Sequence, residues 1–137
     1  MSHPSPHGPG FHHIAMRAAD LDATIRFYRE GLGFSVAYAW GEGDGRAVML
    51  DAGDGVCVEF FAGGALDPVR AEGAILHYAL RTGDCNAAYQ RALAAGAQDH
   101  SAPQDVLVPG EPPLPIRIAF VRGLDGEIIE FFQNDRL

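Results

Sequence analysis

Two histidines and two glutamates occupy equivalent places in a sequence that repeats itself. The segment HIAMRAAD starts at His13, and the similar segment HYALRTGD starts at His77. The segment DGVCVEFF contains Glu59, and its counterpart DGEIIEFF contains Glu130. Imidazole nitrogens and carboxylate oxygens are the donors that divalent metals take from proteins. The internal repeat therefore predicts one metal site with these four residues as ligands.

The surroundings of the two glutamates support a metal over coincidence. Glu59 lies within the apolar run CVEFF, and Glu130 lies within IIEFF. A buried carboxylate is almost never tolerated without a partner. Two imidazoles and two carboxylates suit zinc, nickel, cobalt or ferrous iron. The alternative is that two core histidines and two strand-end glutamates align without sharing a function.

Arginine is the side-chain cation available for an anionic substrate, because the sequence contains no lysine. Arg17 and Arg81 are equivalent in the repeat, and we expect them either to bind substrate or to form salt bridges with nearby aspartates. Arg117 is a further substrate-binding candidate. Cys57 alternates with Glu59 and could line the same face, although a small buried side chain is the simpler interpretation. His12 is expected to face away from His13 and to be packed or on the surface.

The composition indicates a globular protein that binds a small molecule. The 137 residues are 47% hydrophobic and 20% charged, with a net charge of −8. An acidic chain of this kind argues against nucleic acid or an anionic membrane as a partner. The sequence offers no apolar stretch of about 20 residues and no secretory signal in residues 1–10, so we expect a cytoplasmic protein.

The repeat also predicts how the chain is organised. Residues 1–10 are rich in proline, glycine and histidine and are expected to be disordered. The remaining residues, 11–137, are predicted to form a single domain. This domain consists of a first module (11–61), a joint (62–73) and a second module (74–132).

Each module is predicted to have the order βαβββ. Hydrophobic periodicity and turn residues place the expected elements as follows: in the first module, strands at about 11–17, 34–40, 46–51 and 56–61, with a helix after Asp20; in the second, strands at 74–81, 97–101, 116–122 and 127–132, with a helix at 85–95.

These elements predict an α+β fold in which tandem modules form a curved mixed sheet around a cavity, with the helices on its outer face. Strand alternation places all four predicted ligands on one face, away from the helices. The proline-rich stretch 103–115 interrupts the second repeat. It is expected to be a loop that acts either as a lid over the site or as an ordinary surface insertion.

The segments HIAMRAADLDATIRFYREGLGF and IAFVRGLDGEIIEFF resemble the vicinal oxygen chelate superfamily. This superfamily contains glyoxalase I, bleomycin resistance proteins and extradiol dioxygenases, and the resemblance covers roughly residues 11 to 133, with glyoxalase I-like members the most similar. It implies that His13, Glu59, His77 and Glu130 bind one divalent metal ion. It also implies that Glu130 is the catalytic base and Glu59 its symmetric partner.

The resemblance implies a metal-dependent lyase or isomerase that removes a proton next to a metal-chelated carbonyl, with a thiol hemithioacetal as one expected substrate. One alternative is an extradiol-type dioxygenase with iron held by His13, His77 and Glu130. Another is a resistance protein that binds a small molecule or antibiotic without catalysis, which an aromatic-lined cavity without metal would favour.

The resemblance has further implications for the thiol and for assembly. Arg17 matches an arginine that contacts glutathione in glyoxalase I. The asparagine-containing segment and the lysine that accompany glutathione use are absent from this sequence. Relatives with this architecture usually build each site at the junction of two chains, which implies a homodimer.

Overall fold

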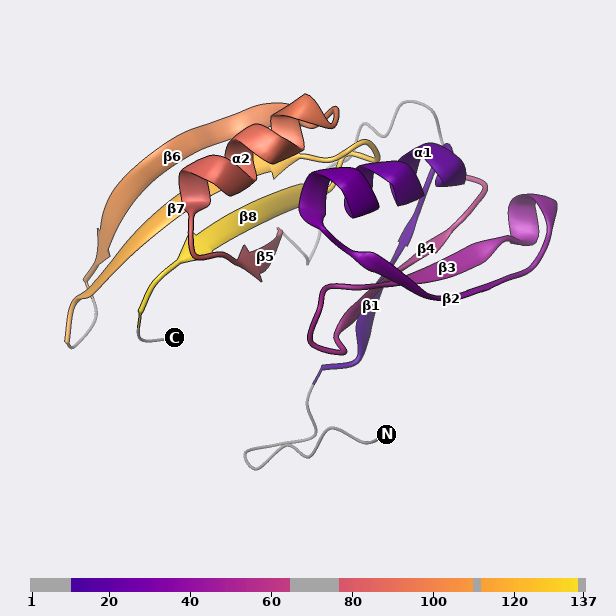
Figure 1. The fold of residues 1–137 in the computed structure, drawn as a ribbon, viewed down its shortest axis with the longest axis horizontal. Helices are drawn as coiled ribbons and strands as arrows, with labels where there is room; N and C mark the ends of the chain where they lie inside the picture. The colour runs from indigo at the N-terminus through magenta and orange to yellow at the C-terminus, as the bar shows by residue number, and fades with distance from the viewer. Residues whose placement is uncertain (1–10, 65–76, 110–111, 136–137) are drawn as a thin grey trace. The chain divides into compact units, whose positions relative to one another are not determined.

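The computed structural model describes residues 11–64, 77–109 and 112–135 (Figure 1). It divides into two compact units, Met1–Asp67 and Pro68–Leu137, which are considered separately below. The predicted disorder of residues 1–10 lies outside the described residues. So do most of the predicted joint and the first residues of the strand expected at 74–81.

Among the described residues, each unit has one α-helix and four strands, as the repeat predicted. The first unit comprises β1 (His13–Arg17), α1 (Leu21–Arg26), β2 (Ser35–Trp40), β3 (Ala47–Asp51) and β4 (Cys57–Phe61). A π-helical turn (Phe27–Gly31) extends α1, and a 3-10 turn (Gly43–Gly45) precedes β3. The second unit comprises β5 (Tyr78–Arg81), α2 (Cys85–Ala94), β6 (Gln98–Val108), β7 (Leu114–Arg122) and β8 (Ile128–Gln133).

The two helices begin at equivalent capping aspartates. The side chain of Asp20 accepts a hydrogen bond of 3.1 Å from the backbone nitrogen of Ala23. Asp84 does the same for Ala87 at 3.0 Å. Such caps satisfy backbone N–H groups that have no partner within the helix. Among the described residues, no helix is long and apolar enough to span a membrane.

The two sheets have the same topology, which confirms an α+β fold built from βαβββ repeats. Their strand orders are β1-β4-β3-β2 and β5-β8-β7-β6. In each sheet the first and last strands of the module pair in parallel, and the other neighbours are antiparallel. The register is also repeated, because Ala15 pairs with Glu59 and Ala79 pairs with Glu130.

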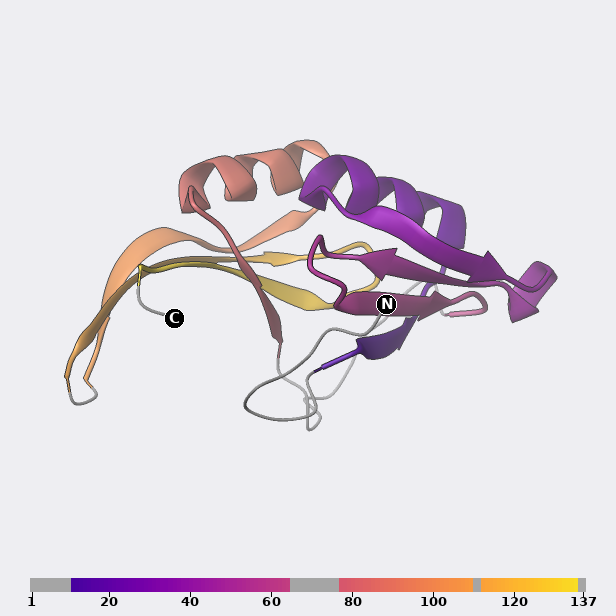
Figure 2. The same ribbon diagram turned by 60° about the horizontal axis from the view of Figure 1, so that its bottom comes forward.

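One face of each sheet packs against its helix (Figure 2). In the first unit the rings of Tyr28 and Phe60 lie 4.9 Å apart between centroids. In the second, the thiol of Cys85 contacts the carbonyl oxygen of Phe131 at 3.8 Å. Because side chains alternate along a strand, Glu59 and Glu130 occupy the opposite face of their sheets. This confirms the predicted strand alternation.

The stretch 103–115 is not the loop that the sequence predicted. The expected short strand at 97–101 continues as β6 to Val108, and β7 starts at Leu114, so most of the stretch forms a β-hairpin. β6 is an edge strand, where proline removes no hydrogen bond that the sheet needs. Pro103 falls at a shift in register between Ser101 and Gln104. Prolines therefore marked a break in register here rather than a loop.

Candidate metal centre

The first unit brings His13 and Glu59 together. His13 starts β1 opposite Cys57, and Glu59 follows two residues later on the same face of β4. The Nε2 atom of His13 lies 3.6 Å from Oε1 of Glu59. Glu59 is only 7% exposed, so its carboxylate has little contact with water. An imidazole and a buried carboxylate therefore meet at one point of this sheet.

The second unit repeats this arrangement with His77 and Glu130. The Nε2 atom of His77 lies 3.1 Å from Oε1 of Glu130, which is 8% exposed. His77 lies just before β5, two residues before Ala79, which pairs with Glu130. His13 likewise lies two residues before Ala15, which pairs with Glu59. The two units therefore hold His–Glu pairs of the same residue types, register and burial, formed by the residues that the sequence repeat predicted.

The environment of Glu130 favours its neutral form when no metal is bound. Burial raises the pKa of Glu130, and the nearby His77 acts in the opposite direction through its charge and hydrogen bond. A carboxylate kept from water in this way is stabilised by any cation that binds it. The imidazole of His77 also packs edge-on against Phe120, with 5.2 Å between ring centroids.

Arg17 and Arg81 lie at equivalent positions on the faces that carry the glutamates. Arg17 pairs with Phe61 in the parallel register, and Arg81 pairs with Phe132. The guanidinium of Arg17 donates a 3.0 Å hydrogen bond to the carbonyl oxygen of Ala62 and lies 5.9 Å from the centre of the Phe61 ring. Within the described part of the chain, Arg17 takes part in no ion pair, so the structure gives no support to a salt bridge with an aspartate cap.

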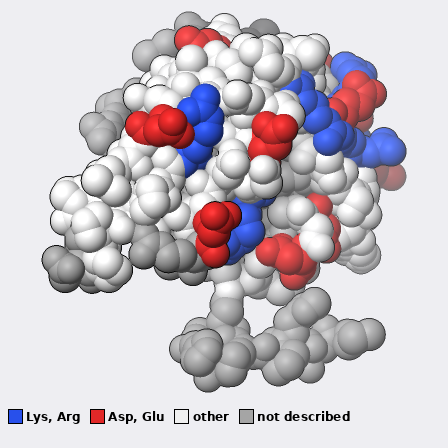
Figure 3. Space-filling view, turned by 60° about the vertical axis from the view of Figure 1, so that its left-hand side comes forward, with Lys and Arg blue, Asp and Glu red and all other residues white. Residues whose placement is uncertain are grey.

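The structure does not bring Arg117 together with the His77–Glu130 pair. Arg117 lies on the helix side of β7, where it donates to Asn86 on α2 at 3.0 and 3.1 Å and pairs with Asp105 at 3.0 Å. On the face drawn in Figure 3, acidic and basic side chains lie next to one another at several places. Strand alternation explains the placement, because Arg117 has opposite parity to the Phe120 that contacts His77.

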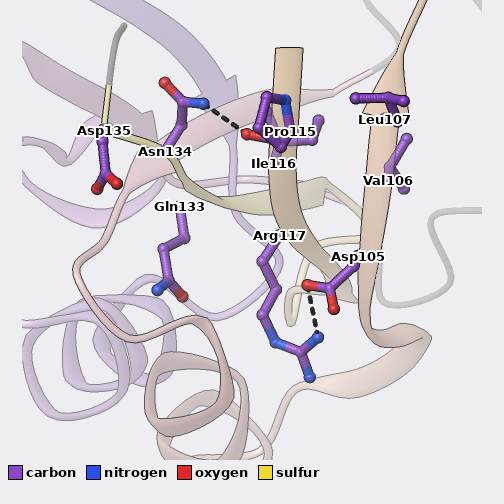
Figure 4. Close-up of a pocket in the computed structure, with 9 residues that line it drawn as sticks. All are labelled: Asp105, Val106, Leu107, Pro115, Ile116, Arg117, Gln133, Asn134 and Asp135. Atoms are coloured by element: carbon purple, nitrogen blue, oxygen red, sulfur yellow. Dashed lines mark hydrogen bonds and ion pairs between the residues drawn. The ribbon is translucent and has the colours of Figure 1, made fainter. Parts of the chain in front are cut away.

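Arg117 instead lines a cavity of about 530 Å³ near the tip of the β6–β7 hairpin. Figure 4 shows the Arg117–Asp105 pair on one side and the hydrogen bond from Asn134 to the carbonyl of Pro115 on another. The guanidinium of Arg117 is thus occupied by protein groups.

Two further histidines lie near the predicted ligands, and one of them, His12, was expected to face away from His13. His12 is exposed, but its Nδ1 atom is 2.9 Å from Nδ1 of His13, so it does not face away. Strand β1 begins only at His13, and alternation does not extend to the preceding residue. The ring of His100 lies 6.2 Å from that of Phe120, which in turn contacts His77. His100 sits at a bulge in β6, where alternation also fails.

Cys57 is a buried side chain rather than an activated thiol. It is 6% exposed, and its Sγ atom lies 4.0 Å from the carbonyl oxygen of Gly55. Burial raises its pKa, and the negative charges of Asp51 and Asp54 raise it further. A reactive cysteine needs the opposite environment.

The donor types in the two pairs fit a divalent metal. Each pair offers one imidazole nitrogen and one carboxylate oxygen, and together they would provide the mixed nitrogen and oxygen set preferred by zinc, nickel, cobalt and ferrous iron. Within the described residues, no three histidine, cysteine, aspartate or glutamate side chains group closely enough to hold an ion. The assignment of all four ligands to one ion therefore remains a prediction.

The sequence matches the glyoxalase/bleomycin resistance protein/dioxygenase superfamily over residues 10–110. The chain belongs to this superfamily. Members of the superfamily typically bind a divalent metal and act on or bind small molecules, although some are resistance proteins without catalysis. No curated protein sequence matches the chain.

Solved structures of superfamily members share this fold. TioX from Micromonospora sp. ML1 is 22% identical over 93% of this chain and 100% of its own, with a TM-score of 0.67. A superfamily domain from Frankia sp. EAN1pec is 19% identical over 93% of both chains, with a TM-score of 0.75. A glyoxalase I mutant from Zea mays is 22% identical over 89% of this chain and 43% of its own, with a TM-score of 0.73. At these identities the likeness establishes the fold and leaves the reaction open.

Proposed function

We propose that this superfamily member is a metal-dependent lyase or isomerase of the glyoxalase I type. The observation that supports this most directly is the duplicated pair, His13–Glu59 at 3.6 Å and His77–Glu130 at 3.1 Å. Each pair buries a carboxylate beside an imidazole, which is costly unless the carboxylate gains a partner. A binding function alone would not require two such pairs at repeated positions.

The residues suggest how a proton would be moved. When bound, the metal would hold two neighbouring oxygens of the substrate and stabilise the negative charge that develops on them. A carboxylate oxygen of Glu130 would accept the proton from the carbon next to the carbonyl. Glu59 would take the proton of the substrate hydroxyl and deliver it to the adjacent carbon, and Glu130 would pass the proton that it holds to the former carbonyl oxygen. Because Glu130 is also a predicted metal ligand, its carboxylate would have to leave the metal at least partly to act as the base.

Metal analysis and an isomerisation assay test this proposal. The purified chain should contain about one divalent ion per site and should convert hemithioacetals to thioesters. Metal-free protein that is active, or metal-loaded protein that converts no hemithioacetal formed from several thiols, would contradict it.

A protein that binds a small molecule without catalysis is the second candidate, since Tyr38 and Trp40 are exposed on the sheet face that carries Glu59. The two functions differ in a measurable way. A binding protein would retain an aromatic ligand unchanged and would need no metal. The dioxygenase alternative would instead require ferrous iron and oxygen.

Glutathione is expected to be a poor thiol for this protein. The two carboxylates of glutathione require cations, and the chain has no lysine, so Arg17 and Arg81 would have to provide them. Activity with the glutathione hemithioacetal should be weak or absent in a coupled absorbance assay, and a smaller thiol serves as the comparison. A kcat/KM above ~10⁶ M⁻¹s⁻¹ with glutathione would show that this expectation is wrong.

A homodimer with two shared sites is expected, in which the first module of one chain and the second module of the other supply each site. Mixing an inactive His13→Ala chain with an inactive Glu130→Gln chain should then restore activity, because one of the two sites in each heterodimer has all its ligands. Random mixing should give about a quarter of the wild-type rate. Size-exclusion chromatography gives the oligomeric state. A monomer, or a mixture that stays inactive after subunit exchange, would exclude shared sites.

A further inference from the structure

Three aromatic side chains form a continuous strip on the metal-ligand face of the first unit. The rings of Tyr38 and Trp40 on the edge strand β2 lie 5.5 Å apart between centroids, tilted by 35°. The ring of Trp40 lies 6.3 Å from that of Phe61 on β4, at 89°. The guanidinium of Arg17 lies over Phe61 and ends the strip. Tyr38, Trp40 and Phe61 are called the aromatic strip below.

Strand register places the aromatic strip beside the His13–Glu59 pair. Phe61 is the next residue after Glu59 on the same face of β4. Tyr38 pairs with Met49 on β3, and Met49 pairs with Glu59. Neighbouring strands are about 5 Å apart and each residue of a strand adds about 3.3 Å, so Phe61 lies about 7 Å and Tyr38 about 10 Å from Glu59 along the sheet. A single small molecule can therefore reach both features.

The strip is exposed where packing would normally cover it. Tyr38 is 65% exposed and Trp40 37% exposed, whereas the helix face of the same sheet buries Val58 and Phe60 almost completely. Tyr38 and Trp40 share one side of β2 because side chains alternate along a strand, and the register shift between Val36 and Tyr38 places that side on the face of Met49 and Glu59. Adjacent exposed aromatic rings beside a predicted metal pair are typical of a ligand-binding surface.

We propose that the substrate carries a planar aromatic group that lies on the aromatic strip, while its two neighbouring oxygens reach the metal ion predicted at the His13–Glu59 pair. This inference rests on the proposed function, because it assigns the substrate class of the same site. The side chain of Arg17 at the end of the strip favours a neutral or anionic ring over a cationic one. A substrate with only a methyl group would leave the strip uncovered.

Mandelate and lactate provide a matched test with the full-length protein. Both are α-hydroxy acids with two neighbouring oxygens, and they differ in a phenyl against a methyl group. Trp40 is the single tryptophan of the chain, so its fluorescence reports directly on the strip. With zinc present, mandelate should bind about tenfold more tightly than lactate and should change Trp40 emission. Isothermal titration calorimetry gives both dissociation constants.

Variants separate the strip from the rest of the surface. Tyr38→Ala should reduce the preference for mandelate severalfold, and Trp40→Leu, followed by calorimetry, should do the same. Val36→Ala is the matched control, because Val36 is exposed on the same strand but pairs with Leu50, on the opposite face. It should leave the preference unchanged.

Three results would overturn the inference. The first is equal affinity for mandelate and lactate, and the second is Trp40 emission that does not respond to mandelate. The third is Trp40 already shielded from iodide in the ligand-free protein, which would mean that another protein surface covers the strip. The proposed function fails separately. A preference for mandelate in a protein without hemithioacetal isomerase activity would contradict the proposed function but would support the aromatic strip as a binding surface. Turnover of methylglyoxal adducts without that preference would contradict the strip alone.

Discussion

Replacing His77 with alanine should remove the bound metal and abolish activity. His77 is the imidazole that lies 3.1 Å from Glu130, and its loss would leave that buried carboxylate without its neighbour. Metal content, measured by mass spectrometry, should fall from about one ion per site to near zero. If the ion is present at a hundred times its dissociation constant, its loss lowers the free energy of unfolding by about 2.7 kcal/mol. The melting temperature should fall by on the order of 10 °C.

His100→Ala is the matched control for this experiment. His100 is an exposed histidine of the same unit whose ring contacts Phe120, but it is not a predicted ligand. Its removal should leave metal content unchanged. A His77→Ala protein that retains its full metal content would show that His77 is not a ligand.

Replacing Glu130 with glutamine should lower turnover by about 10²- to 10⁴-fold, because the amide cannot accept the proton from carbon. The side chain keeps its size and one oxygen, so the variant can be assayed at saturating metal. Glu42→Gln, at an exposed turn before β3, makes the same change of charge and should leave turnover unaffected. Wild-type turnover by the metal-loaded Glu130→Gln protein would contradict the assignment of Glu130 as the base.

The same variant has a second, purely thermodynamic signature in chelator-treated protein. Burial raises the pKa of Glu130 above the usual value of 4.5, so the folded state binds this proton more tightly than the unfolded chain does. The resulting stabilisation is complete below the unfolded pKa and is lost as the pH rises through the folded pKa. Glutamine does not titrate. The stability of the variant relative to wild type should therefore increase with pH across this interval in urea titrations.

Much of the fold was predictable because the signals are local and occur twice. Asp20 and Asp84 cap helices that start where the sequence indicated. Alternation in CVEFF and IIEFF predicted which residues face the helices, and the ring contact between Phe60 and Tyr28 confirms it in the first unit. These features depend on backbone geometry and on neighbours within a few residues, and the sequence contains both.

The predictions were wrong where pairing between strands decided the outcome. The prolines of 103–115 suggested a loop, but β6 pairs with β7 as far as Val108 and Leu114. Arg117 was expected near the substrate, yet it bonds to Asn86 on the helix side of the sheet. Alternation also failed at His12, which precedes β1. Strand ends and bulges depend on the partner strand, which no local pattern reveals.

The sequence by itself determined the two His–Glu pairs, because a repeated fold places repeated residues at repeated positions. Only the tertiary structure decided what lies beside them. Tyr38 and Trp40 lie 20 or so residues before Glu59 in the chain, and a register shift in β2 turns both rings toward the face of that carboxylate. Such a shift is set by hydrogen bonds between strands that are distant in sequence, so the aromatic strip became visible only once the sheet had formed.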